Sequence, residues 1–451
     1  MTMSSENIAA NKRLSVCKWT DLTADERSSV LQRPAVRAND EISQQAADII
    51  AKVRSDGDAA LIAFANQFDK AELTSLRVSD EEAAEAGEII GEQARDAIAA
   101  AIANVTRYHE AQQPTPIKVE TAPGVVCERV TRAIPAVGLY VPAGTAPLPS
   151  TAIMLAVPAG IAGCERRVLC TPARPDGKAD PAVVYAAWRC GIRDIFKIGG
   201  AQAVAAMAYG TDSVPAVDKI FGPGNAWVTA AKTLVSTDPA GAALDMPAGP
   251  SEVMVVADGS AKPRAVALDL LSQAEHGIDS QVVLVTTDAE LAAQADAQIS
   301  IALETLPRAD IIVQALANSV TILVDDLAQA FEVANQYAPE HLIIQVEEPR
   351  RYVDRIQNAG SVFLGPWTPE SVGDYCSGTN HVLPTYGYAR QYSGLSLAAF
   401  QKQISMQELT LDGLRGLAPT VTTLAGLEGL DAHAQAVIVR LEDADNEGPG
   451  S

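Results

Sequence analysis

The sequence predicts an α/β protein in which one α/β segment interrupts another. Between about residues 125 and 249, short β-rich runs alternate with helical stretches, and glycines mark the turns between them. A second alternation of strands and helices begins at residue 253, after a break rich in proline and glycine at residues 245–252. Hydrophobic residues make up 48% of the chain and aromatic residues 5%, which suits Ala-rich helices packed on sheets. We therefore expect two Rossmann-like α/β domains, one inserted in the other.

Composition excludes several classes of function. A chain of 451 residues has room for two to four domains with a large core. The net charge is −22 and no basic block occurs, which argues against nucleic-acid binding. The six cysteines show no CxxC spacing, so we interpret them as reduced thiols. No apolar run is long enough to span a bilayer, and the start has no secretory signal. We expect a soluble, cytoplasmic protein without a membrane partner.

The N-terminal third is predicted to be helical. Residues 1–30 are polar and are interpreted as an arm. Two helices between residues 39 and 68 are joined at Ser55-Asp56-Gly57-Asp58. A long amphipathic helix follows, with Ser79 and Glu82 as a capping box, and runs to His109, which we expect at the surface.

Two strand-to-helix turns in the middle of the chain are rich in glycine. The strand 194–198 runs into Gly199-Gly200-Ala201-Gln202, and a second strand runs into Phe221-Gly222-Pro223-Gly224-Asn225. This order presents backbone N–H groups and a helix N-terminus to a phosphate or nucleotide. Neither turn is a GxGxxG fingerprint, so for each alone a plain βα turn is about as good an interpretation. Two such turns in one segment favour a ligand cleft at the strand ends.

The second α/β run and the C-terminal segment complete the expected domains. The predicted strands are 253–256, 281–287, 320–324, 342–346 and 361–364. Beyond about residue 388 the chain is predicted to be mostly helical. The expected division is therefore an arm at 1–30, a first α/β domain at 31–139 and 250–388, an inserted domain at 140–249 and a helical C-terminal segment at 389–451.

The stretch Leu270–Gly277 ends a helix with two polar side chains on one face. Gln273 and His276 are three residues apart and point the same way, whereas Glu275 cannot. An amide oxygen and an imidazole at a helix end can hold a metal ion. Taken alone, the better interpretation is a protonated histidine at the helix C-terminus with a solvated glutamine.

An acid and a histidine, Glu340 and His341, stand where a helix ends and a strand begins. A histidine beside a carboxylate can move protons near neutral pH. A surface helix terminus is an equally good interpretation of this pattern. The loop 373–381 supplies Asp374 and His381, and we interpret it as a site loop because a simple connection needs neither residue.

The last helical segment carries Glu428 and His433, five residues apart, a pattern that chance can produce. Together, Gln273, His276, Asp374 and His433 would form a mixed N/O ligand set suited to zinc or a related divalent ion. Residue spacing cannot assemble ligands from such distant positions. The residues alone thus indicate an α/β protein with a nucleotide-like cleft and a candidate metal site.

Several long segments resemble the L-histidinol dehydrogenase family. They are GLYVPAGTAPLPST, GGAQA, KIFGPGNAWVTAAK, DMPAGPSE, LLSQAEHG, NQYAPEHL, AGSVFLG and ESVGDYCSGTNHVLPTYG, and the match is collinear from about residue 30 to 440. The resemblance implies a zinc-dependent, NAD-linked, four-electron oxidation of L-histidinol to L-histidine through L-histidinal. It also implies a homodimer with exchanged C-terminal segments and assigns NAD binding to residues 140–249.

The resemblance also implies residue roles. Gln273, His276, Asp374 and His433 resemble the ligands of one zinc ion per subunit, which orients the substrate. His341 resembles the base in both oxidations, and Glu340 resembles the group that activates water. The expected substrate contacts are Ser251, Gln273, His276, His341, Asp374, His381, Glu428 and His433. The expected NAD contacts are Tyr140, Gln202 and Asn225.

One position departs from the family, because Ala143-Gly144 stands where two glycines are usual. An alanine there has a cost if the backbone needs a positive φ. Two other classes compete with the dehydrogenase. A zinc hydrolase would use metal-bound water, which leaves the two glycine turns without a role. A non-enzymatic nucleotide-binding or assembly protein predicts losses among the site residues, and none is lost.

Overall fold

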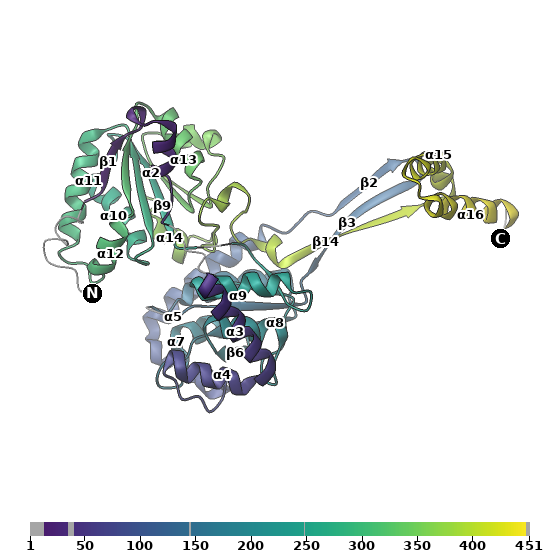
Figure 1. The fold of residues 1–451 in the computed structure, drawn as a ribbon, viewed down its shortest axis with the longest axis horizontal. Helices are drawn as coiled ribbons and strands as arrows, with labels where there is room; N and C mark the ends of the chain where they lie inside the picture. Colours follow the sequence, from purple (N-terminus) through teal and green to yellow (C-terminus); the bar gives the residue numbers. More distant parts are fainter. Residues whose placement is uncertain (1–12, 35–39, 144–145, 248, 448–451) are drawn as a thin grey trace. The chain divides into compact units, whose positions relative to one another are not determined.

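A computed structural model describes residues 13–34, 40–143, 146–247 and 249–447 (Figure 1). The chain divides into two compact units. The larger unit comprises the chain up to Gln112 together with Ile134–Phe400, and the smaller unit comprises Gln113–Ala133 and the chain from Gln401 onward. The mixed α/β class with parallel sheets, predicted from the sequence, is confirmed.

The larger unit contains a five-stranded parallel sheet with the order β6-β5-β4-β7-β8. Its strands are β4 (Ala136–Tyr140), β5 (Arg166–Thr171), β6 (Asp194–Lys197), β7 (Lys219–Phe221) and β8 (Ala243–Leu244). The connecting helices are α6 (Pro149–Ala162), α7 (Pro181–Arg189), α8 (Gly200–Tyr209) and α9 (Ala226–Thr237). Every residue of β4 is buried, as expected for a parallel strand with helices on both faces.

Three N-terminal helices pack on the helices of this sheet. They are α3 (Asp40–Asp56), α4 (Asp58–Phe64) and α5 (Asp80–Glu110). Helix α3 lies against α8 and α9, and α5 lies against α6 and α7. Ile50 and Leu61 share one hydrophobic core with Val168 and Phe196 of the sheet. The expected grouping of residues 31–139 with 250–388 is therefore corrected, because the apolar faces of α3–α5 are buried against the five-stranded sheet's helices.

The larger unit also contains a six-stranded parallel sheet with the order β1-β11-β10-β9-β12-β13. Its strands are β1 (Ser15–Lys18), β9 (Glu252–Ala257), β10 (Gln281–Thr286), β11 (Val320–Leu323), β12 (His341–Gln345) and β13 (Ser361–Leu364). Its helices are α10 (Pro263–Ala274), α11 (Ala289–Ala302), α12 (Ala309–Leu316), α13 (Leu327–Tyr337) and α14 (Glu370–Tyr375). The strands predicted in this run agree with the structure to within one or two residues.

The first residues of the described chain are part of this sheet. Strand β1 pairs in parallel with β11, and a short helix α2 (Ala24–Val30) follows it. Leu14 and Trp19 are buried in the two hydrophobic cores that flank the sheet. The arm expected at residues 1–30 is thus corrected for its described part, since backbone pairing and these two side chains hold it on the sheet.

His109 is buried rather than exposed. Its Nδ1 lies 2.8 Å from the carbonyl oxygen of Val105, one turn earlier on α5, and its Nε2 lies 3.4 Å from the side chain of Asn380. Burial lowers the pKa of His109. The surface position expected from the charged helix end was wrong, because α5 continues under the loop that carries Asn380.

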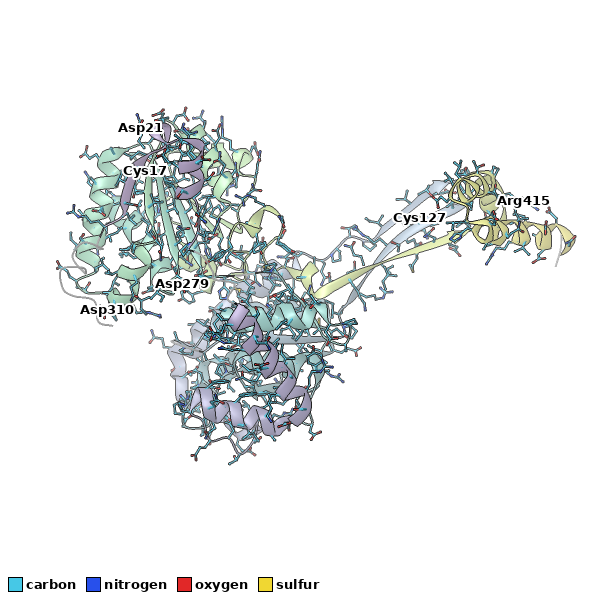
Figure 2. The ribbon with its side chains drawn as sticks, in the orientation of Figure 1. Cys17, Asp21, Cys127, Asp279, Asp310 and Arg415 are labelled. Carbon is cyan, nitrogen blue, oxygen red and sulfur yellow. The ribbon has the colours of Figure 1, made fainter. Side chains whose placement is uncertain are left out.

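The smaller unit is built on a three-stranded antiparallel sheet with the order β14-β3-β2. The strands are β2 (Ile117–Ala122), β3 (Val125–Ala133) and β14 (Gln401–Leu409), and the helices are α15 (Leu411–Glu428) and α16 (Asp431–Glu447). Arg415 on α15 pairs with Asp445 on α16 at 2.6 Å (Figure 2). The segment 389–451, expected to be helical, therefore contains a nine-residue strand, which pairing with β3 stabilises.

Candidate active site

Glu340 and His341 lie at the amino-terminal end of β12, beside the amino-terminal end of β9. Helix α13 ends at Ala338, whose left-handed φ of 53° turns the chain, and Pro339 leads it into the strand. Both side chains are buried, with 5% and 3% of their surface exposed. A surface helix terminus, the alternative interpretation of this pattern, is therefore wrong.

The hydrogen bonds of His341 fix the roles of its two nitrogens. Nδ1 lies 3.1 Å from the carbonyl oxygen of Glu252, which can only accept, so Nδ1 carries a proton. Nε2 is buried without a hydrogen-bond partner and lies 3.6 Å from Oδ1 of Asp374. When the imidazole is neutral, its basic lone pair is therefore on Nε2, on the side of Asp374. Such an arrangement suits a proton acceptor.

Carboxylates surround this imidazole. Burial lowers the pKa of His341, but Glu370, Glu340 and Asp374 outweigh burial and hold its pKa well above the usual value. Burial raises the pKa of both Glu340 and Glu370 to about 8, although His341 opposes the shift. Burial also acts to raise the pKa of Asp374, but the interaction with the nearby His341 lowers it overall. Strongly shifted groups of opposite charge in one buried cluster are typical of a catalytic or ligand site.

Three side chains of this cluster can hold a metal ion. One ligand atom from each of His341, Glu370 and Asp374 lies within 4.8 Å of the others. Of the four ligands expected from the sequence, Asp374 belongs to this group. Glu370 was missed, although it stands four residues before Asp374, a spacing that places both on one face of α14.

Gln273 reaches this cluster from the end of α10, and the exposed His276 follows two residues beyond that end. Gln273 is buried, and with its amide in the satisfied orientation its nitrogen donates to the Glu370 carboxylate, which directs its oxygen away from Glu370. His276 places Nδ1 3.0 Å from the carbonyl oxygen of Ser272, which leaves Nε2 for a ligand, and its charge acts on Asp374. Amide, imidazole and carboxylate donors together fit a divalent ion such as zinc.

His381 and Ser251 flank the cluster. Nδ1 of His381 lies 2.7 Å from the carbonyl oxygen of Asp374, and its Nε2 lies 3.1 Å from Oγ1 of Thr151. His381 therefore fixes the backbone of the Asp374 loop in this structure. Ser251 is half-buried and directly precedes Glu252, the first residue of β9. Contact of either side chain with substrate stays a prediction.

Glu428 and His433 belong to the smaller unit. Glu428 is the last residue of α15, and His433 lies in the first turn of α16, where its N–H donates to the carbonyl oxygen of Leu430. Both side chains are exposed. Their assignment to the metal and substrate site stays a prediction.

The glycine turns of the five-stranded sheet carry the three expected NAD contacts. Tyr140 ends β4, and its hydroxyl accepts from the N–H of Gly200 at 3.0 Å. Gln202 is buried in the first turn of α8, and Asn225 caps α9 by accepting from a backbone N–H. A Cβ on Gly222, whose φ is 118°, would lie 2.1 Å from the carbonyl oxygen of Tyr140. The turns thus bring backbone and two helix N-termini close together, which fits a dinucleotide phosphate.

The loop after β4 holds the one departure from the family. Ala143 is half-buried, and Gly144 lies outside the residues that the structure describes. A cost of the alanine for cofactor binding therefore stays a prediction.

A buried ion pair fixes the turn at Gly222. Oδ2 of Asp245 accepts from the Gly222 N–H at 2.8 Å, and Nζ of Lys232 donates to the Gly222 carbonyl oxygen at 2.9 Å. Lys232 and Asp245 also pair with each other, with side chains that are 8% and 2% exposed. Both polar groups of the glycine are therefore held by the protein, a role that the sequence did not indicate.

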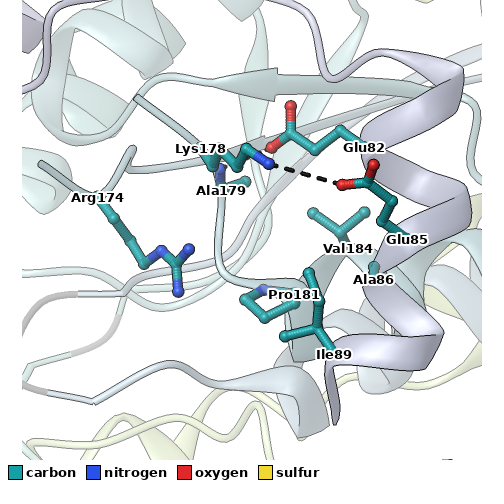
Figure 3. Close-up of a pocket in the computed structure, with 9 residues that line it drawn as sticks. All are labelled: Glu82, Glu85, Ala86, Ile89, Arg174, Lys178, Ala179, Pro181 and Val184. Carbon is teal, nitrogen blue, oxygen red and sulfur yellow. Dashed lines mark hydrogen bonds and ion pairs between the residues drawn. The ribbon is translucent and has the colours of Figure 1, made fainter. Parts of the chain in front are cut away.

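A small hollow between α5 and the start of α7 is unrelated to this chemistry (Figure 3). Lys178 and Glu85 pair at 3.6 Å on its wall, with Glu82 beside them. None of the site residues predicted from the sequence lines it.

The fold and the buried acid–histidine cluster define an α/β enzyme, and comparison with known proteins identifies its family. A sequence model described as histidinol dehydrogenase matches residues 31–441. The chain is 54% identical over 424 residues to histidinol dehydrogenase from Photobacterium profundum, covering 94% of this chain and 95% of the relative. It is 53% identical over 424 residues to the enzyme from Vibrio parahaemolyticus, covering 94% of this chain and 97% of the relative.

A solved structure agrees with these relatives. The crystal structure of histidinol dehydrogenase from Elizabethkingia anophelis superimposes with a TM-score of 0.92 at 44% identity, covering 96% of this chain and 99% of the other. The chain belongs to the histidinol dehydrogenase family and is an oxidoreductase that acts on a CH–OH group. The competing hydrolase and non-enzyme classes are thereby set aside. Among the residues described, no helix has both the length and the apolarity needed to cross a membrane.

Proposed function

We propose that this protein is a zinc-dependent, NAD-linked enzyme that oxidises L-histidinol to L-histidine through L-histidinal, the last steps of histidine biosynthesis. The observation that supports the proposal most is the buried pair Glu340–His341 beside Gln273, Asp374 and Glu370. Two successive oxidations of one carbon need a base that acts twice and a group that activates water once. The cluster contains a histidine and carboxylates, which are groups able to perform both tasks.

His341 is proposed as the base in both oxidations. Its Nε2 takes the alcohol proton while hydride leaves the carbinol carbon for the nicotinamide ring. Glu340 then takes a proton from water as the water oxygen adds to the aldehyde carbon. His341 releases its first proton to solvent before it acts again. The monoanionic hydrate then loses its remaining hydroxyl proton to His341 and its hydride to a second NAD, which yields the carboxylate.

The metal and cofactor sites are assigned to the residues expected from the family. Gln273, His276, Asp374 and His433 would hold zinc, which when bound supplies a fixed point for the substrate's imidazole and amino nitrogens. Ser251, His381 and Glu428 would contact substrate polar groups. Tyr140, Gln202 and Asn225 would contact NAD at the glycine turns of the five-stranded sheet.

A homodimer with exchanged C-terminal segments is also proposed. The smaller unit exposes many apolar side chains, and Leu427 is 80% exposed. Such a surface is typical of a protein interface. Glu428 and His433 lie in the same unit, so a partner chain that covers it would bring these two residues to a shared site. We also propose that the protein is located in the cytoplasm.

The direct test is the number of NADH molecules formed per histidinol consumed, before and after chelation of metal. We expect two NADH per histidinol, loss of turnover on chelation with the fold retained, and recovery on adding zinc. Retained folding is checked by circular dichroism. Full activity in a sample verified to be free of metal would contradict the zinc assignment, and a ratio of one would contradict the four-electron reaction.

Mixed dimers test the shared site. A His433→Ala chain paired with a His341→Asn chain would form one intact site and one doubly defective site if tails are exchanged. Random reassociation of equal amounts should then restore up to about a quarter of wild-type activity, while each homodimer alone stays nearly inactive. Verified mixed dimers without rescue would show that each site is built from one chain.

A further inference from the structure

Arg33 is anchored at the base of the candidate active site. Its Nε donates to Oε2 of Glu252 at 2.5 Å and its Nη2 donates to Oε1 at 2.7 Å, so both carboxylate oxygens are engaged. The two side chains are 11% and 2% exposed. Nη2 also donates to the carbonyl oxygens of Tyr337 and Ala338, at 2.8 and 3.3 Å. The arginine thus joins β9 to the turn that leads into Glu340.

Glu252 in turn holds Glu340 from two directions. Its backbone N–H donates to Oε2 of Glu340 at 2.9 Å, and its own Oε1 accepts from the backbone N–H of Glu340 at 3.3 Å. The hydroxyl of Tyr337 donates to Oε1 of Gln281 at 2.8 Å and lies 3.3 Å from Oε2 of Glu252. The Arg33 guanidinium lies 3.9 Å from the centre of the Tyr337 ring. We call this reciprocal arrangement of Glu252 and Glu340 the carboxylate clasp.

Two acidic side chains share one buried pocket, which costs desolvation energy and repulsion unless a cation compensates. A planar guanidinium that binds both oxygens of Glu252 supplies the charge and fixes the orientation. The carbonyl group of Glu252 that accepts from His341 is held separately, because β9 is paired with β10 and β12 along its length. Arg33 therefore acts mainly on Glu340.

We propose that Arg33 is a positioning residue for oxidation of the aldehyde, because it fixes the Glu252 carboxylate and through the clasp holds Glu340 in the orientation that activates water. This inference rests on the proposed function. It predicts that loss of the guanidinium fork slows the second oxidation selectively, since the first oxidation uses His341 and not Glu340.

The test is single-turnover NADH formation with enzyme in excess over histidinol, in which each oxidation appears as one NADH per histidinol. Arg33→Lys keeps the charge but loses the fork. The second phase should slow about 30-fold and the first phase less than about 3-fold, because a small misplacement of a reacting group can cost up to about 100-fold in rate. Arg33→Met should slow the second phase further, so lysine acts as a partial rescue.

Ile299→Ala is the matched control for lost stability. Ile299 is fully buried on α11, and its truncation should lower the melting temperature while leaving both phases unchanged. If Arg33→Lys does not fold, Tyr337→Phe decides the question, since it removes the hydroxyl that contacts Glu252 and Gln281 and leaves the Arg33 fork in place. It should slow the second phase about 3-fold and spare the first.

A double-mutant cycle tests the route through Glu340. In a Glu340→Gln background, Arg33→Lys should slow the second phase no further. Equal slowing of both phases, no slowing of the second, or an additive loss in the cycle would overturn the proposal. Failure of the proposed function is distinguishable, because wild-type enzyme would then not form two NADH per histidinol.

Discussion

The two parallel sheets of the larger unit carry their candidate sites at opposite ends of their strands. In the five-stranded sheet, the glycine turns follow the carboxyl ends of β6 and β7, where α8 and α9 begin. In the six-stranded sheet, Glu252 and His341 are the first residues of their strands, so the acid–histidine cluster lies at the amino ends. Sheets of the same architecture therefore carry two different candidate sites, because the polar residues lie at the carboxyl ends of the strands in one sheet and at the amino ends in the other.

The direction of the neighbouring helices explains which ligand charge is favoured at each end of the strands. The N-termini of α8 and α9 carry partial positive charge and neutral side chains, which favours an anion such as a phosphate. Helix α10 runs back from the carboxyl end of β9, so its C-terminus brings partial negative charge to the amino edge, together with Gln273 and His276. With Asp374 and Glu370 nearby, that edge favours a cation. The two sheets thus present groups that favour opposite charges.

The largest effect on rate is expected for a substitution at the amino ends of the six-stranded sheet's strands. His341→Asn should slow both oxidations by about 1000-fold, because the base that accepts protons from Nε2 is removed. Affinity for NAD, measured by fluorescence titration, should stay within about twofold. If the substitution mainly weakened NAD binding instead, the assignment of chemistry and cofactor binding to different sheets would be contradicted.

Glu340→Gln should have the next largest effect and should be selective. The amide oxygen can still accept from the Glu252 N–H, but the side chain can no longer take a proton from water. Oxidation of histidinal should slow about 100-fold and the first oxidation much less. Each substrate is assayed separately, and equal losses on both would contradict the separate duties of Glu340 and His341.

A substitution at the carboxyl ends of the five-stranded sheet's strands should weaken cofactor binding. Gly222→Ala places a Cβ against the Tyr140 carbonyl oxygen at a φ that disfavours side chains, so the turn must shift. We expect the KM for NAD to rise about tenfold while the KM for histidinol changes little. Ile299→Ala, in the hydrophobic core beside the six-stranded sheet, is the control and should leave both constants unchanged. A rise in the KM for histidinol would show that the two edges are not independent.

The smallest effect concerns Asp69, a carboxyl near Tyr140 whose Oδ2 is buried without a hydrogen-bond partner. Burial raises the pKa of Asp69 to about 6, so its ionised form destabilises the fold above that pH. Asp69→Asn should add roughly 1 kcal/mol to the free energy of unfolding above about pH 7, after allowance for solvent screening. The gain should disappear below about pH 4, where the carboxyl is neutral in both states. Urea unfolding at the two pH values checks this, and a pH-independent gain would contradict it.

The local pattern of the sequence determined most helices and strands of both parallel sheets, although β1 was expected to be part of an arm. Apolar runs bounded by glycine and proline predicted β10 and β13, and Ser79 correctly marked the start of α5. Strand β14 was not predicted, because its residues are mostly exposed and the strand forms only by pairing with β3. Pairing between residues about 270 positions apart leaves no local signal.

Local signals also identified the chemical groups of the site, but not their arrangement. The pair Glu340–His341 and the residues Gln273, His276 and Asp374 were selected from motifs and from resemblance to a family. Only the tertiary structure showed that Arg33 reaches Glu252, that Nδ1 of His341 donates to a backbone carbonyl, and that Glu370 joins the cluster. The reason is that hydrogen bonds and pKa shifts depend on distances and burial, which folding sets between segments that the sequence leaves far apart.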